Sequence, residues 1–269
     1  MEDVLTEVPP PSRFYQDELN NFAPPLPPTP SPFLLFSNPN PNLPLCPSLL
    51  IIALSSPSLY IFHHVSSKRL IGGLILPETQ FSGNSIEPSL RNKSCNIYSL
   101  SDDEEKSVIL ISVQCPVAAE RSHIVAKLLI GGEIVPQRVV VLDSVQSPNF
   151  RGKLPPDEAF AFKLETSSER KGLCDGFKGL EYFPTGSVVD GLGAALLGRC
   201  QMRNIKGSLC VTWPEFGCDV VSLVKSLLLD NVLPGLDLST LHNGGGGDGD
   251  EFSGFSQIKD RSYDSDLYT

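Results

Sequence analysis

The chain has 269 residues, 41% of them hydrophobic, with 31 acidic against 21 basic residues and a net charge of −10. This apolar content is too high for a wholly disordered chain and is enough for a sizeable core. The acidic balance argues against nucleic acid as a partner, because phosphate binding needs clustered cations.

Residues 1–47 form a proline-rich N-terminal arm that holds 13 of the 24 prolines and a net charge of −4. Proline fixes φ and removes a backbone donor, so we expect an extended or polyproline II-like arm. Its PxxP spacings within residues 9–32 leave open a role as an adaptor ligand, and the apolar run Phe33–Phe36 could pin part of the arm to the body.

The sequence shows none of the features that would indicate secretion, a membrane span or a metal site. The acidic start is the opposite of a secretory signal, and the longest apolar run, Leu49–Leu54, is far shorter than the ~18–20 residues of a membrane span. Seven cysteines, an odd number without a CxxC, suit reduced thiols in a core. We expect a chain of the cytosol or nucleus, with no membrane contact, metal or cofactor.

Short apolar runs bounded by turn residues predict a series of strands in the first half of the chain. Leu49–Leu54 is continuous, as in a strand buried on both faces. The further strands are expected at residues 58–62, 70–76, 95–100 and 107–113.

Strand and helix patterns alternate in the second half, which is typical of an α/β fold with partly parallel strands. Helices are expected at 118–130, where Gly131-Gly132 would end the helix, and at 187–200 and 219–230. Strands are expected at 138–142, 159–164 and 208–213. We therefore predict one mixed-sheet α/β domain over 48–235, followed by a flexible acidic tail over 236–269 that contains Gly244–Gly247.

No catalytic pattern stands out in the body. The stretch Asp190–Leu196 resembles a dinucleotide-binding loop, but Leu196 occupies its third glycine position and no buried strand precedes it. Its small residues are better explained by close packing of a helix on a sheet or a partner. A nucleophilic pair such as Cys115 with His123 stays open, because partners meet in space rather than in sequence.

The chain ends Leu267-Tyr268-Thr269, a hydrophobic residue and a tyrosine before the terminal residue. An α-carboxylate can pair with a lysine at the bottom of a pocket, and a tyrosine ring supplies rigid buried area and a hydroxyl donor. The glycine-rich linker before this triplet would let it reach a site remote from the body.

Four stretches resemble the proteasome assembly chaperone 1 family: the opening Met1–Glu7 with Pro9–Pro11, then Asn149–Leu154, Phe160–Thr166 and Gly186–Leu197. The resemblance implies a non-enzymatic, three-layer α/β sandwich related to nucleoside-phosphorylase-like domains. It also implies pairing with proteasome assembly chaperone 2 and assembly of the 20S proteasome α-ring. Leu267, Tyr268 and Thr269 would then dock between α-subunits. The competing hypothesis is a nucleoside phosphorylase- or hydrolase-like enzyme, which predicts a polar pocket at the carboxyl ends of the strands.

Overall fold

The computed structural model describes residues 30–37, 44–77, 94–100, 107–155, 158–172 and 176–238. Its folded unit begins at Ser31. The strands are β1 (Phe33–Phe36), β2 (Leu49–Ala53), β3 (Arg69–Ile75), β4 (Cys95–Ser99), β5 (Val108–Val113), β6 (Arg138–Ser144), β7 (Phe160–Glu165), β8 (Glu181–Tyr182) and β9 (Lys206–Trp213). The helices are α2 (Ser56–His63), α3 (Ala119–Leu129), α4 (Ser167–Arg170), α5 (Gly191–Arg203) and α6 (Cys218–Leu227), with a 3₁₀ turn at Ser147–Asn149 and a π-helical turn at Leu228–Val232.

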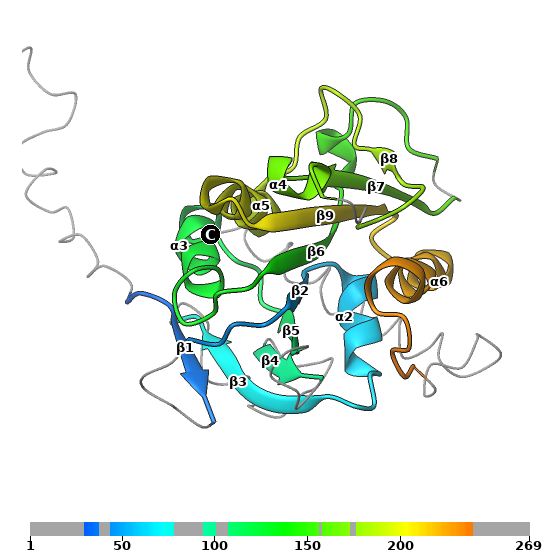
Figure 1. The fold of residues 1–269 in the computed structure, drawn as a ribbon. Helices are drawn as coiled ribbons and strands as arrows, with labels where there is room; N and C mark the ends of the chain where they lie inside the picture. The colour runs from blue at the N-terminus through cyan, green and yellow to red at the C-terminus, as the bar shows by residue number, and fades with distance from the viewer. Residues whose placement is uncertain are drawn as a thin grey trace, which may run out of the picture. The chain divides into compact units, whose positions relative to one another are not determined.

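The described strands form one mixed sheet in the order β1-β3-β4-β5-β2-β6-β9-β7-β8 (Figure 1). Its centre is parallel, since β2 pairs with β5 and β6, and β6 pairs with β9. Antiparallel pairing links β1, β3, β4 and β5 on one side and joins β7 to β9 on the other. The expected mixed sheet, with antiparallel strands added to a parallel centre, is confirmed.

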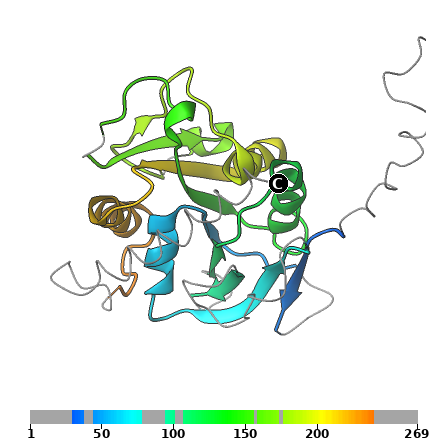
Figure 2. The same ribbon diagram turned by 180° about the vertical axis from the view of Figure 1, so that it is seen from behind.

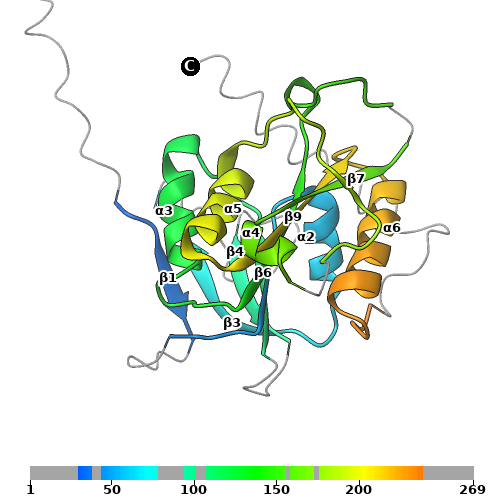
Figure 3. The ribbon, with the colours of Figure 1, turned by 45° about the horizontal axis from the view of Figure 1, so that its top comes forward.

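Helices cover both faces of the sheet, which gives the predicted three-layer α/β sandwich. Helices α3 and α5 lie side by side on one face, and α2 and α6 pack together on the other (Figure 3). Strand β2 serves both cores, because Leu50 and Ile52 enter the α3/α5 core and Ile51 and Ala53 enter the α2/α6 core. A strand covered on both sides needs an uninterrupted apolar run.

The strand predicted at 58–62 is wrong, because these residues belong to helix α2. Every residue from Ser56 to Phe62 is buried, so the helix has no solvent-exposed face over this segment and the sequence shows no helical periodicity. Pro57 stands in the first helical turn, where its missing N–H costs no hydrogen bond. A proline before an apolar run is compatible with the start of either a strand or a helix, and here it starts a helix.

The folded body begins before the predicted boundary at residue 48. Strand β1 pairs antiparallel with β3, and Leu45 bridges Ile134, so both lie within the segment that the sequence analysis assigned to the arm. Leu34 is buried in the α3/α5 core, and Phe36 packs against it. The view from behind shows β1 at the margin of the sheet beside β3 (Figure 2). Burial of these two side chains explains the pairing of so short a strand.

Several other predicted features lie close to what the structure shows. Gly131 adopts a φ of +94° just after α3, which fits the predicted stop. Helix α5 begins at Gly191 rather than 187 and ends at Arg203, with the left-handed Asn204 as its C-cap. Of the described cysteines, Cys95, Cys115, Cys200 and Cys210 are buried thiols, and Cys46 and Cys218 are exposed. Among the helices of the described segments, none is long and apolar enough to cross a bilayer.

Candidate functional site

The predicted anchors Leu267, Tyr268 and Thr269 lie outside the described residues, as do the glycine-rich linker and the PxxP spacings of the arm. The geometry that bears on function is therefore that of the body. Two polar regions stand out there, a pocket at the carboxyl ends of the parallel strands and a cluster of charged side chains around β7.

The pocket forms where the parallel strands end. Leu54 follows β2, Asp143 and Ser144 end β6, and Glu215 follows β9. The first turn of α5, with Asp190 at its N-cap, closes another side, and the volume is about 320 Å³. Crevices at this edge are the usual ligand sites of open α/β sheets, so this is the place where an enzyme of this architecture would bind substrate.

A glycine brings α5 close to β6 at this pocket. A Cβ added at Gly193 would lie 2.3 Å from Asp143 Oδ2, so the helix approaches the strand end more closely than any side chain would allow. The backbone N–H of Ser144 donates to Asp143 Oδ1 at 2.9 Å, and Asn149 Nδ2 donates to Asp190 Oδ2 at 3.0 Å. Gly193 thus serves helix–sheet packing, the explanation favoured from the sequence, whereas a Cβ added at Gly191 would meet nothing within 4 Å.

The chemistry of the pocket does not suit phosphorolysis. Asp143, Asp190 and Glu215 contribute carboxylates, while the described lining contains no lysine, arginine or histidine. A phosphate co-substrate would meet three negative charges without a cationic side chain to bind it. Cys115 lies in the wall, but His123 is exposed on α3, and no hydrogen bond in the described segments joins the two. Those segments also contain no group of three potential metal ligands.

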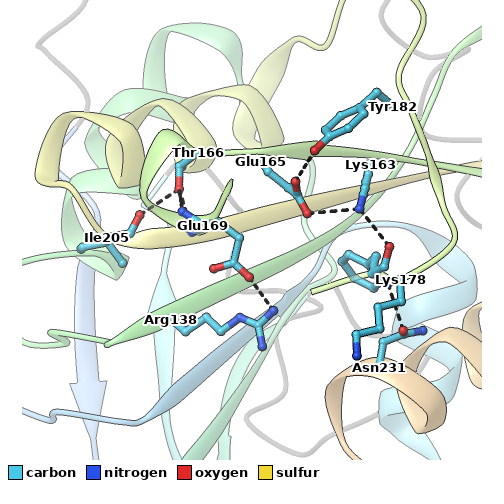
Figure 4. Close-up of polar contacts among 11 residues, drawn as sticks. Arg138, Lys163, Glu165, Thr166, Glu169, Lys178, Tyr182, Ile205 and Asn231 are labelled. Carbon is cyan, nitrogen blue, oxygen red and sulfur yellow. Dashed lines mark hydrogen bonds and ion pairs between the residues drawn. The ribbon is translucent and has the colours of Figure 1, made fainter. Parts of the chain in front are cut away.

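The second polar region holds the segment after α4 against the sheet (Figure 4). Arg138 at the start of β6 pairs with Glu169 of α4 at 2.6 Å, and Glu169 is almost fully buried. Lys163 Nζ lies 3.5 Å from Glu165 Oε1 and donates to the carbonyl oxygen of Phe177 at 3.1 Å. Each charged side chain of this cluster lies beside an opposite charge, and Lys163 also donates to a carbonyl oxygen. This pairing indicates a structural role.

Tyr182 joins this cluster from the edge strand β8. Its hydroxyl donates to Glu165 Oε2 at 2.7 Å, and the Arg170 guanidinium lies 5.1 Å from the ring centroid. The hydrogen bond to the Glu165 carboxylate raises the pKa of Tyr182, because it stabilises the neutral phenol. The ring itself is half exposed.

This cluster was not predicted from the sequence. In the alternating pattern of 159–164, Lys163 stands on the polar side, yet the structure buries it. The face of β7 that carries Phe160, Phe162 and Leu164 is only partly buried. The available signal was a lysine and a glutamate at i and i+2 of one strand, which places both charges on one face.

No family model matches the chain. A search of curated proteins also found no significant match. Solved structures do match its fold. A Thermoplasma acidophilum protein of unknown function has a TM-score of 0.54 and 14% identity, covering 82% of this chain and 89% of that one.

Two Pyrococcus furiosus structures match over a similar length. PbaA, described as an archaeal homologue of proteasome-assembly chaperone, has a TM-score of 0.54 and 12% identity, covering 83% of this chain and 90% of its own. PbaB, described as an archaeal proteasome activator, has a TM-score of 0.51 and 12% identity, covering 88% of this chain and 96% of its own. The resemblance drawn from the sequence is thus confirmed at the level of the fold, which this chain shares with PbaA and PbaB.

Proposed function

We propose that this protein is a proteasome-assembly chaperone that pairs with proteasome assembly chaperone 2 and promotes assembly of the 20S α-ring in the cytosol or nucleus. The observation that carries the proposal is the fold shared with PbaA, itself a homologue of a proteasome-assembly chaperone. The C-terminal triplet Leu267-Tyr268-Thr269 supports it independently, because it has the chemistry needed to enter a pocket with a basic floor.

The proposed mechanism combines two contacts. The folded body covers one face of the α-ring, and the tail inserts Leu267, Tyr268 and the terminal carboxylate of Thr269 between α-subunits. About 30 residues separate Leu238 from the chain end, and a glycine-rich chain of that length has a root-mean-square span of about 30 Å. Tethering makes the second contact effectively intramolecular, so two weak contacts give useful avidity.

The test measures binding of the full chain, alone and co-expressed with proteasome assembly chaperone 2, to purified α-subunits. Tyr268→Ala should weaken binding by at least about 30-fold, since loss of a buried aromatic anchor typically costs 2 kcal/mol or more. Deleting residues 267–269, or adding one residue after Thr269 to displace the carboxylate, should have a comparable effect. Tyr263→Ala is the matched control, with the same residue type in the same tail. Equal affinities for Tyr268→Ala and Tyr263→Ala would exclude the tail from the mechanism.

A hydrolase-like activity is the second candidate, and the carboxylate-lined pocket is the observation that favours it. Paired carboxyl groups can act as general acid and base without a cofactor. Incubation with a panel of nucleosides tests this function, with Glu215→Gln as the variant that should abolish turnover. Release of free base by the unaltered chain and not by Glu215→Gln would favour the enzyme.

A further inference from the structure

Six basic side chains gather where α3 and α5 end and β9 begins. We call this surface the basic end; it comprises Lys127, Arg170, Lys171, Arg199, Arg203 and Lys206. It lies at the amino ends of the parallel strands, whereas the carboxylate-lined pocket lies at their carboxyl ends. Helices α3, α5 and α4 follow one another along this part of the molecule (Figure 3).

Two arginines of α5 are fixed in place by carbonyl groups. Arg199 Nε donates to the carbonyl oxygen of Ile130 at 3.1 Å, and Arg203 donates to that of Gly131 at 3.4 Å. Both guanidinium groups therefore lie at the C-terminus of α3, where the helix dipole favours positive charge. Met202, on the same face of α5, leaves 63% of its surface exposed.

Side-chain hydrogen bonds connect this group to α4. Gln201 Oε1 accepts from the backbone N–H of Ser167 at 2.8 Å, and Thr166 Oγ1 donates to the carbonyl oxygen of Ile205 at 3.1 Å. These bonds hold α4, with Arg170 and Lys171, beside the turn that leads to Lys206. The basic end is thus continuous across three helices.

The charges of the basic end are not neutralised within the described segments. Ion pairs there join Arg138 to Glu169 and Lys163 to Glu165, and none involves a residue of the basic end. Glu133 and Glu181 are the exposed acidic residues of the adjoining described segments. A surface with arginine, an exposed methionine and unpaired positive charge is suited to an acidic protein segment.

The chain itself supplies such a segment. Residues 248–269 carry six acidic and two basic side chains. They follow Leu238 after nine residues, which span at most about 30 Å when extended. The last described residue of the chain, Leu238, is buried in the α2/α6 core, so the linker must pass around the edge of the sheet to reach the basic end on the other face.

We propose that the basic end binds this chain's own acidic tail, residues 248–269, and so holds Leu267–Thr269 on the body until an α-subunit competes for them. The competition rests on the proposed function, whereas the tail contact does not. A tether of this length gives a millimolar effective concentration, so a weak electrostatic contact suffices for occupancy.

Zero-length carbodiimide cross-linking of the full chain tests the contact, since it joins lysine amines to carboxylates in direct contact. We expect cross-links from Lys127, Lys171 and Lys206 to acidic residues of 248–269, at yields at least fivefold above those from Lys153. Lys153 is an exposed lysine in the segment after β6, away from the basic end. The yields should fall as salt shortens the Debye length from about 30 Å at 0.01 M to about 3 Å at 1 M.

A variant with Arg170→Gln, Arg199→Gln and Arg203→Gln keeps the reporter lysines and should lower the yields several-fold. Arg151→Gln, an exposed arginine elsewhere, is the matched control and should leave them unchanged. Mixing ¹⁴N- and ¹⁵N-labelled chains separates contacts within one chain from those between copies. Yields equal to that of Lys153, cross-links between copies, or cross-links to acidic residues of the N-terminal arm would each overturn the proposal.

Binding to α-subunits is a separate measurement. If the tail contact exists, the triple glutamine variant should bind α-subunits several-fold more tightly, because its tail is released. Cross-links within the chain without any α-subunit binding would refute the proposed function and leave the tail contact standing. Binding to α-subunits that depends on Tyr268, without cross-links within the chain, would support the proposed function and refute the tail contact.

Discussion

Two glycines of helix α5 should respond in opposite directions to alanine. At Gly198 an added Cβ has no heavy atom within 4 Å, whereas at Gly193 it would lie 2.3 Å from Asp143 Oδ2 and 3.3 Å from Asp143 Cγ. Both substitutions remove the conformational freedom of glycine from the unfolded chain. That effect alone stabilises a helix by about 0.4–1 kcal/mol, so Gly198→Ala should raise the free energy of unfolding by this amount.

At Gly193 the steric cost exceeds that gain. Asp143 must rotate, and doing so strains the 2.9 Å hydrogen bond that it accepts from the backbone of Ser144. Overpacking a tight contact costs about 1–3 kcal/mol, and loss of the hydrogen bond adds about 1 kcal/mol. We therefore expect Gly193→Ala to destabilise the protein by about 1–3 kcal/mol.

Urea denaturation followed by circular dichroism measures both variants. The two alanine variants should differ by about 2–4 kcal/mol in the free energy of unfolding. At about 2–4 °C per kcal/mol for a domain of this size, their melting temperatures should differ by roughly 4–16 °C. If Gly193→Ala proved as stable as Gly198→Ala, the close approach of α5 to β6 would be refuted.

Three further predictions concern the polar cluster and the thiols. Glu169→Gln should destabilise the protein by about 2–4 kcal/mol in urea denaturation, because it removes the charge that pairs with Arg138. An unchanged urea midpoint would show that hydration of the Arg138 guanidinium suffices without the pair. Glu165→Gln should lower the pKa of Tyr182 towards that of a free phenol, which ultraviolet titration detects. Since the raised pKa stabilises the folded protein only while the phenol is neutral, this contribution should disappear as the pH rises through the folded-state pKa, and a pH dependence identical in Glu165→Gln would contradict it. Burial raises the pKa of Cys95, Cys200 and Cys210 to about 12, so Cys46 and Cys218 should react with a thiol reagent well before them at pH 8, as peptide mass spectrometry would show; comparable rates would mean that the core opens readily.

The sequence by itself determined the fold class and several elements. The apolar run at 49–54, the strand at 107–113 and the helix over 118–130 with its glycine stop are found as expected, because burial of one or both faces imposes a pattern that the chain carries locally. The same is true of Gly193 in the stretch 190–196, which allows close helix–sheet packing. The terminal triplet is likewise a property of the sequence, and its role is a proposal.

Tertiary structure alone decided the features that depend on residues distant in the chain. Helix α2 could not be told from a strand, since contacts on every side erase its periodicity. The pairing of β1 with β3, the burial of Lys163 beside Glu165 and the gathering of Arg199 and Arg203 at the end of α3 all depend on which segments meet in space. The local sequence determines which backbone hydrogen bonds a segment can form and which of its side chains must be buried. The contacts of a charged side chain with distant residues form only when the whole sheet has assembled.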